Sequence, residues 1–136
     1  MKLGAVLVMA PDIDEALRFY RDTLGLDLME QFAGHLVFDL GATRLHVFRC
    51  ERDAPVSDHA RDGGSVIAFE TSSIDQTMAS LMAKGVRFLH ESPAFNPETN
   101  LRYAAFRAPG GIVHELIEYL GEGSVKLSPT RRIRSD

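Results

Sequence analysis

The sequence predicts an α+β fold made of two βαβββ units, one in each half of the chain. One observation is an order of elements that occurs twice: an apolar strand, a helix with one apolar stripe, and a run of further strands. Another is that Ile13-Asp14 matches Ile74-Asp75, and Gly25 matches Gly85. The two matches are separated along the chain by distances that differ by one residue, so the two halves repeat a structural pattern and not a strict sequence. So long a period indicates two copies of a unit that cannot bury its sheet face alone.

The first half of the chain predicts one helix among four strands. Residues 3–9 form an apolar run of strand length, and residues 12–24 carry apolar side chains at three- and four-residue spacing. Asp12 or Asp14 can cap the start of this helix, and Gly25 is placed to end it. The remaining strands are expected at residues 26–32, 34–40 and 42–49, separated by hairpin breaks. The buried stripe of the helix is expected to be Ile13, Ala16, Leu17, Tyr20 and Leu24.

The second half repeats this order after a polar connection. A helix is expected over residues 73–84, with Ser72 or Ser73 as its cap and Gly85 at its end. Its buried stripe is expected to be Ile74, Met78, Leu81 and Met82. The connection is expected at residues 50–64, and a polar loop is expected at 91–100. Strands are expected at residues 65–71, 86–90, 101–107 and 112–120, with a turn at 109–111 between the last two.

Composition and charge exclude several classes of protein. An apolar fraction of 45% and a mean hydropathy of -0.07 describe a globular chain, and 136 residues suit one domain built of two similar halves. A net charge of -4 argues against a basic nucleic-acid-binding protein. Cys50 is the one cysteine, so no intrachain disulfide can form, which fits a cytoplasmic protein. The apolar run at residues 3–9 is too short for a membrane span or signal peptide, so no membrane partner is expected.

The last predicted strand carries a candidate catalytic carboxylate. Alternation places Glu115 on one face with Val113 and Ile117, and places His114 on the other face with Leu116. If the first of these faces is the inner one, Glu115 is a carboxylate held inside a cleft. Burying a carboxylate is costly unless it is paired, bound to a metal or used chemically. In the alternative arrangement, Glu115 faces solvent at the edge of a sheet.

Three segments of the chain resemble the vicinal oxygen chelate superfamily, which includes glyoxalase I, bleomycin-resistance proteins and extradiol dioxygenases. They are PDIDEALRFYRDTLGLDL at residues 11–28, IAFETSSID at 67–75 and APGGIVHELIEY at 108–119. The resemblance implies a glyoxalase-like open barrel, in which two curved sheets enclose a cleft for a small ligand. It implies one domain over residues 1–120, with units at 3–49 and 65–120. Residues 121–136 are then a C-terminal tail, either mobile or lying across a partner subunit.

The resemblance also implies four metal-ligand positions, of which two cannot ligate in this chain. The first-strand positions fall on Ala5 and Val66, where metal-using relatives carry histidine. The other two positions fall on His46 and Glu115, and His35 is expected on a different strand. Because a tight transition-metal site usually has three or four protein ligands, we expect the isolated protein to hold no stoichiometric metal. A divalent ion would need substrate or water to complete its ligands.

The strand predicted at residues 42–49 supplies the candidate ligand-binding residues. Arg44, His46 and Phe48 alternate with apolar residues, so they form either the solvated face of the sheet or a wall of the cleft. The family-like arrangement puts them in the cleft and adds Tyr103 as a polar-tipped aromatic residue. A cleft of this composition would suit a small anionic or aromatic molecule.

Three functions fit these residues. The first is a metal-free binding protein, similar to the bleomycin-resistance branch. The second is a lyase or isomerase with Glu115 as general base and His46 as acid or orienting partner, and with Glu115 within reach of Arg44 or His46. The third is a dioxygenase-type metal enzyme whose ligand set is completed by substrate or water. A homodimer is expected in each case, because apolar sheet faces must be covered.

Overall fold

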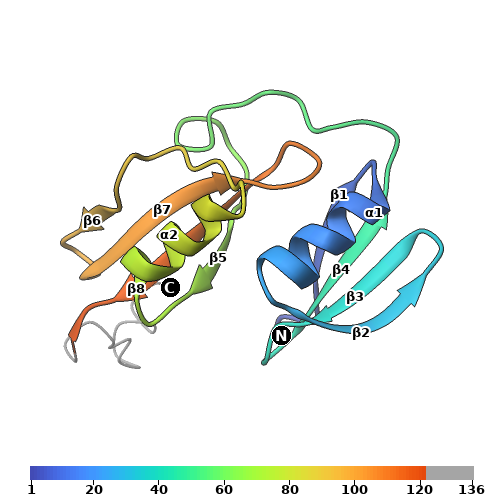
Figure 1. The fold of residues 1–136 in the computed structure, drawn as a ribbon, viewed down its shortest axis with the longest axis horizontal. Helices are drawn as coiled ribbons and strands as arrows, with labels where there is room; N and C mark the ends of the chain where they lie inside the picture. Colours follow the sequence, from blue (N-terminus) through green and yellow to red (C-terminus); the bar gives the residue numbers. More distant parts are fainter. Residues whose placement is uncertain (122–136) are drawn as a thin grey trace. The chain divides into compact units, whose positions relative to one another are not determined.

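The computed structural model describes residues 1–121, which divide into two compact units. The first contains Met1–Asp62 and Ala108–Ile112, and the second contains Gly63–Arg107 and the described residues that follow Ile112. Each unit has a four-stranded sheet with a helix on one face (Figure 1). The predicted α+β fold and the twofold βαβββ order are confirmed. Within the described part of the chain, the strands form two open sheets and no closed barrel.

In the first unit, the sheet has the order β1-β4-β3-β2, in which β1 runs parallel to β4 and the other pairs are antiparallel. The strands are β1 (Val6–Ala10), β2 (Asp27–Phe32), β3 (His35–Asp39) and β4 (Arg44–Arg49). The helical segment packs across β3 and β4 (Figure 1). The side chains of the helical segment pack against alternate residues of β3 and β4. The fully buried side chains between them include Tyr20, Leu36, Phe38, Leu45 and Val47.

The helical segment of this unit begins as α1 (Ile13–Leu17) and continues as a π-helix, η1 (Arg18–Thr23). Asp12 is the cap, because its Oδ1 accepts the N–H of Glu15 at 3.0 Å. Gly25 follows at φ +77° and ends the segment, as expected. Of the expected stripe, Ile13, Ala16 and Tyr20 are buried, whereas Leu17 and Leu24 are half-buried.

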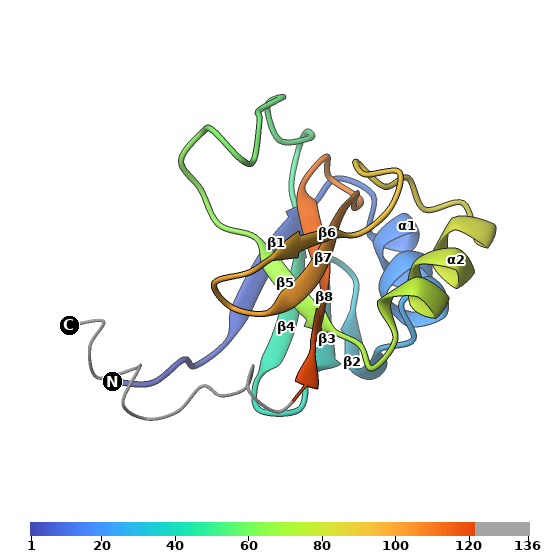
Figure 2. The ribbon, with the colours of Figure 1, turned by 90° about the vertical axis from the view of Figure 1, so that its left-hand side faces the viewer.

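In the second unit, the sheet has the order β5-β8-β7-β6, and α2 (Ile74–Ala83) packs across β7 and β8 (Figure 2). The strands are β5 (Ile67–Glu70), β6 (Ala94–Asn96), β7 (Leu101–Arg107) and β8 (Val113–Tyr119). Ser73 caps α2 by accepting the N–H of Gln76. Glu118, on β8, accepts the N–H of Ile74 at 2.8 Å, so a strand carboxylate satisfies a second donor at the start of the helix.

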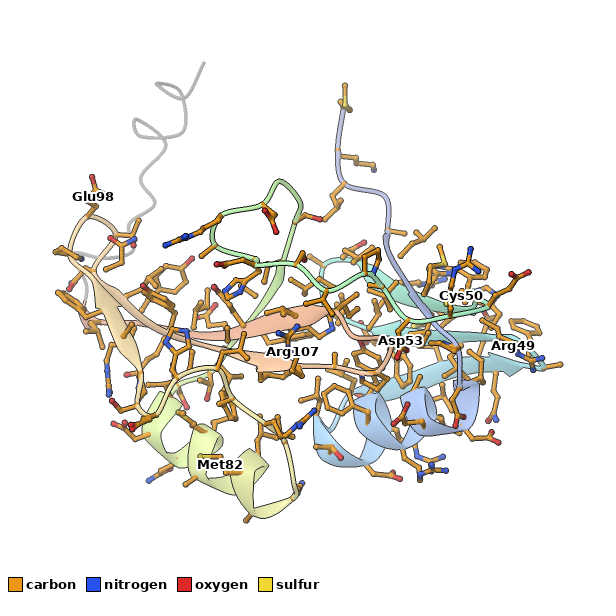
Figure 3. The ribbon with its side chains drawn as sticks, turned by 90° about the horizontal axis from the view of Figure 1, so that it is seen from above. Arg49, Cys50, Asp53, Met82, Glu98 and Arg107 are labelled. Atoms are coloured by element: carbon orange, nitrogen blue, oxygen red, sulfur yellow. The ribbon has the colours of Figure 1, made fainter. Side chains whose placement is uncertain are left out.

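The expected stripe of α2 is correct except at one position. Ile74, Met78 and Leu81 are buried, but Met82 is 52% exposed on α2, where Figure 3 labels it. Consecutive helical residues point about 100° apart, and Leu81 already occupies the sheet side. Met82 therefore lies on the outer surface, and its expected place in the core is wrong.

The strand expected at residues 86–90 is also wrong. This stretch contributes a single bridge, from Phe88 to Phe106, and the next strand is β6, inside the segment expected to be a loop. The side chain of Asn96 accepts two backbone N–H groups in the turn that follows, and Asn100 takes a positive φ of 53°. This local turn chemistry positions three residues against β7, although prolines flank them.

The turn between β7 and β8 belongs to the first unit. Gly110 is buried at φ +92°, and its carbonyl accepts the N–H of Ala54 at 2.7 Å. A Cβ added at Gly110 would lie 2.7 Å from the carbonyl oxygen of Met9. The site therefore needs glycine both for its left-handed backbone and for close approach to another chain segment.

We expect Gly110→Ala to destabilise the protein by about 2 kcal/mol or more, because the new methyl group meets a backbone oxygen in a strained conformation. Urea unfolding of the variant would measure this. Gly63→Ala is the matched control, because a Cβ there meets nothing within 4 Å. Equal denaturation midpoints for the two variants would contradict the packing of this turn.

Two expectations concern the ends of the chain. Residues 122–136 of the expected tail lie outside the described residues. None of the helices in residues 1–121 combines the length and apolar character needed to cross a bilayer.

Candidate functional site

In the first unit, the sheet face opposite the helix carries most of the candidate binding residues. On β4, Leu45 and Val47 are buried toward the helix, while His46 and Phe48 are half-buried on the other face and Arg44 is exposed. The predicted alternation of this strand is confirmed. We call this surface the first open face. The strand register places its members side by side or diagonally: Leu7, Met9, Glu30, Phe32, His35, Val37, Asp39, Arg44, His46 and Phe48, of which Val37 is buried.

The centre of the first open face is a stack of imidazole and phenyl rings. The ring centroid of His35 lies 4.1 Å from that of Phe48, 5.0 Å from that of His46 and 5.4 Å from that of Phe32. All three pairs are close to parallel, with interplanar angles of 14–24°. His35 Nε2 lies 2.8 Å from His46 Nδ1, which is a hydrogen bond between the two imidazoles. The two histidines therefore form one hydrogen-bonded unit held in an aromatic stack.

Around this stack, the first open face combines apolar side chains with one exposed cation, Arg44, and two exposed carboxylates, Glu30 and Asp39. The exposed fractions of Leu7, Met9 and Phe32 are 54%, 46% and 54%. Within its unit, Arg44 forms no ion pair with any described carboxylate. Its cross-strand neighbour Asp39 accepts the N–H of Gly41 at 2.7 Å. An arginine on the same strand face as the imidazoles and the apolar residues suits a planar anion with an apolar body.

The second unit presents Glu115 on the sheet face opposite α2. Its neighbours across the strands are Ala68 on β5 and Ala105 on β7, so small side chains flank the half-buried carboxylate on both sides. Within this unit, no described residue donates a hydrogen bond or forms an ion pair to Glu115. Tyr103 lies diagonally across the strand pair, on the same face. We call this the second open face, with Ala68, Tyr103, Ala105, Glu115 and Ile117 as its members.

Two histidines near these faces were not among the predicted site residues. His90 contacts Tyr103 edge-on at 5.7 Å between ring centroids, and His35 pairs with His46. His35 could have been found from the hairpin, because the short connection at residues 40–43 fixes the register of β3 on β4. The expected approach of Glu115 to Arg44 or His46 joins the two units and remains a prediction.

The opposite face of β8 has a structural role. His114 is 1% exposed and contacts Phe69 and Phe106 edge-on, beside buried Leu116. Burial lowers the pKa of His114 to about 4, because the core disfavours the imidazolium ion. His114 and Glu115 therefore lie on opposite faces of the strand, as predicted.

Two of the residues at the four family metal positions cannot ligate a metal ion. Ala5 and Val66 have no donor atom. The Nδ1 atom of His46 is engaged by His35, and the β1 residue beside His46 is Leu7. Among residues 1–121, no three histidine, cysteine, aspartate or glutamate side chains are grouped so as to hold a metal.

Comparison with known proteins agrees with this architecture. The Glyoxalase/Bleomycin resistance protein/Dioxygenase superfamily model matches residues 2–116. The chain belongs to this superfamily. The resemblance of its three segments to that superfamily is therefore confirmed. Protein YraH of Bacillus subtilis is 28% identical over 127 residues, which are 87% of this chain and 96% of that protein.

Two solved structures show the same superfamily fold. A glyoxalase/bleomycin resistance protein/dioxygenase from Alicyclobacillus acidocaldarius has a TM-score of 0.72 at 17% identity, covering 91% of this chain and 96% of that one. A lactoylglutathione lyase from Agrobacterium tumefaciens has a TM-score of 0.66 at 22% identity, covering 86% and 92%. At these identities, the likeness concerns the fold.

The buried His114 predicts a loss of stability in mild acid. Its pKa is about 4 in the folded protein against an ordinary 6.5, so the unfolded chain takes up a proton first as the pH falls. Above about pH 6.5, burial of the neutral His114 ring does not lower the free energy of unfolding. As the pH falls from about 6.5 to about 4, protonation of the unfolded chain lowers that free energy progressively. This residue alone should account for a loss of about 2 kcal/mol from about pH 8 to about pH 5.

Urea unfolding at several pH values would measure that loss. His114→Gln should flatten the dependence by the same amount, whereas His59→Gln, in the 50–64 connection, should leave it unchanged. An unaltered pH slope in His114→Gln would contradict this role of burial.

Proposed function

We propose that this protein binds a small aromatic anion on the first open face, without a bound metal. The observation that carries the proposal is the hydrogen-bonded pair of His35 and His46, with His35 stacked on Phe48 and with the exposed Arg44 two residues before His46 on the same face of β4. A planar ligand can extend this stack while its carboxylate or phenolate oxygen accepts from Arg44.

The absence of donor atoms at Ala5 and Val66 supports binding without a metal. A ligand held by aromatic contact, a guanidinium and an imidazole needs no Lewis acid for affinity. A dioxygenase-type reaction would need a divalent ion whose ligand set is completed by substrate or water. Of the three functions it has the least support, because the β1 neighbour of His46 is Leu7, which has no donor atom.

The alternative function is a lyase or isomerase in which Glu115 is the general base and His46 is the acid. It is favoured by the place of Glu115 between Ala68 and Ala105, where small neighbours leave the carboxylate open to a ligand. Tyr103 on the same face would contact such a ligand. A carboxylate in this position could remove a proton from a carbon next to a carbonyl group.

We further propose that the chain works as one domain over residues 1–120, as a homodimer in the cytoplasm. Large apolar residues that are exposed outside the first open face, among them Met29 and Leu89, support association, because exposed apolar surface is often covered by a partner. The single cysteine, Cys50, is compatible with a reducing compartment. Sedimentation showing only a 15.1 kDa species at micromolar protein would contradict the dimer.

Benzoate is a suitable probe for the binding proposal, with benzamide as its neutral analogue. We expect Arg44→Gln to weaken benzoate binding about tenfold and to leave benzamide binding nearly unchanged, because a charge-assisted hydrogen bond is lost. Phe48→Leu should weaken both ligands by a few-fold through loss of stacking. Ligand titrations followed by NMR would measure the dissociation constants.

The matched controls for these variants are Arg18→Gln and Phe95→Leu. Arg18 is an exposed arginine on the helical segment, and Phe95 is 52% exposed on β6. Both should bind benzoate as the unmodified protein does. If the control variants lose affinity as much as the site variants do, the first open face is not the binding surface.

The enzyme alternative can be tested by hydrogen exchange into phenylpyruvate, an aromatic 2-oxo acid. If Glu115 is a general base, the protein should speed deuterium incorporation at C3 of phenylpyruvate in D2O. Glu115→Gln should then reduce the rate of incorporation at least about a hundredfold. Benzoate binding should survive in this variant. Exchange that matches the buffer rate with unmodified protein would dismiss the alternative, and exchange kept by Glu115→Gln would dismiss Glu115 as the base.

A further inference from the structure

We propose that His35 is a positioning residue that holds His46 in a single tautomer, with its proton on Nε2. In that form His46 can only donate a hydrogen bond to a ligand. The tautomer follows from the contact between the two rings. Its consequence for ligand choice rests on the proposed function.

The atoms that meet decide the direction of the hydrogen bond. His35 contributes Nε2 and His46 contributes Nδ1, at 2.8 Å. Two neutral imidazoles share one proton in such a contact, so either His35 Nε2–H donates to His46 Nδ1 or the reverse. The first arrangement puts both rings in the Nε2–H form, which neutral histidine prefers in water. The reverse puts both rings in the less stable Nδ1–H form, so two unfavourable tautomers would be needed at once.

The surrounding rings keep His35 in place for this task. Its imidazole is close to parallel with Phe48 and with Phe32, at centroid distances of 4.1 and 5.4 Å. Rotating the ring out of this plane would break these contacts, and a half-turn within the plane would take Nε2 away from His46. His35 and His46 also lie on paired antiparallel strands, so the backbone sets the distance between them. The donor is therefore oriented before any ligand arrives.

This arrangement determines what His46 can offer. Its Nδ1 lone pair is used by His35, and its Nε2 carries a proton, so no lone pair remains for a metal or for proton abstraction. The remaining lone pair of the two rings is Nδ1 of His35. His46 and Arg44 are then both donors on the first open face. The ligand must supply acceptor oxygens, as a carboxylate or phenolate does, and a ligand with donors alone is rejected.

Nitrogen NMR of histidine-labelled protein tests the tautomer without any ligand. At about pH 8, where an imidazole is ordinarily neutral, His46 should show a protonated Nε2 and an unprotonated, hydrogen-bonded Nδ1. A scalar coupling across the hydrogen bond should connect His46 Nδ1 with His35 Nε2. A proton on Nδ1 of His46 in the unmodified protein would overturn the inference, and this measurement needs no variant.

Two substitutions at His35 separate positioning from packing. His35→Phe keeps the stack and removes the donor, so His46 should show averaged nitrogen shifts, and benzoate should bind about threefold to tenfold more weakly. His35→Gln places an amide N–H near the lost Nε2–H, so it should restore the single tautomer and most of the affinity. An identical His46 spectrum in His35→Phe and the unmodified protein would overturn the role of His35.

The two proposals fail in different ways. If the unmodified protein shows the Nε2–H form of His46 but does not bind benzoate, the proposed function falls and the tautomer assignment stands. If benzoate binds while His46 carries its proton on Nδ1, the tautomer assignment falls and the binding proposal stands.

Discussion

The two-residue period of the strands is the constraint on which every candidate site residue depends. On β8, His114 and Leu116 face the helix side and are buried, and Glu118 on that side caps α2. Glu115 lies between His114 and Leu116 in the sequence, but its side chain is on the opposite face of the strand. One strand therefore supplies core packing, a helix cap and a candidate base without conflict, because adjacent side chains point in opposite directions.

The same separation applies to β4, with a different outcome. Leu45 and Val47 fix the strand against the helix, so His46 and Phe48 project from a rigid sheet. Residues supported in this way are better preorganised for a ligand than residues on a loop. The pair of His35 and His46 adds a second layer of order, since one side chain orients the other.

Much of this arrangement could be predicted from the sequence because it rests on local patterns. Alternation correctly grouped Glu115 with Val113 and Ile117, and His46 with Arg44 and Phe48. Gly25 and Gly85 ended the helical segments at positive φ, as their positions indicated. The features that escaped prediction depend on less visible chemistry. β6 is three residues long and flanked by prolines, so its apolar pattern was too short to read. Nothing in residues 18–23 distinguishes a π-helix from an α-helix.

The histidine pair escaped prediction for another reason, because it depends on register. Alternation says which face His35 occupies on its own strand, but a cross-strand partner depends on the hairpin that joins the strands. The position of Glu115 relative to Arg44 is a similar question at a longer range. It depends on the arrangement of two units, which no pattern within one strand can specify.

The buried turn at Gly110 has a consequence for dissecting this protein. Ala108–Ile112 comes from the second half of the sequence but belongs to the first unit, where its backbone meets Ala54 and Met9. A fragment ending at Asp62 would lack that segment and leave Ala10, now 1% exposed, partly uncovered. The internal duplication is therefore not a division into autonomous halves. Cutting the chain after Asp62 would yield two fragments that need each other to complete the first unit.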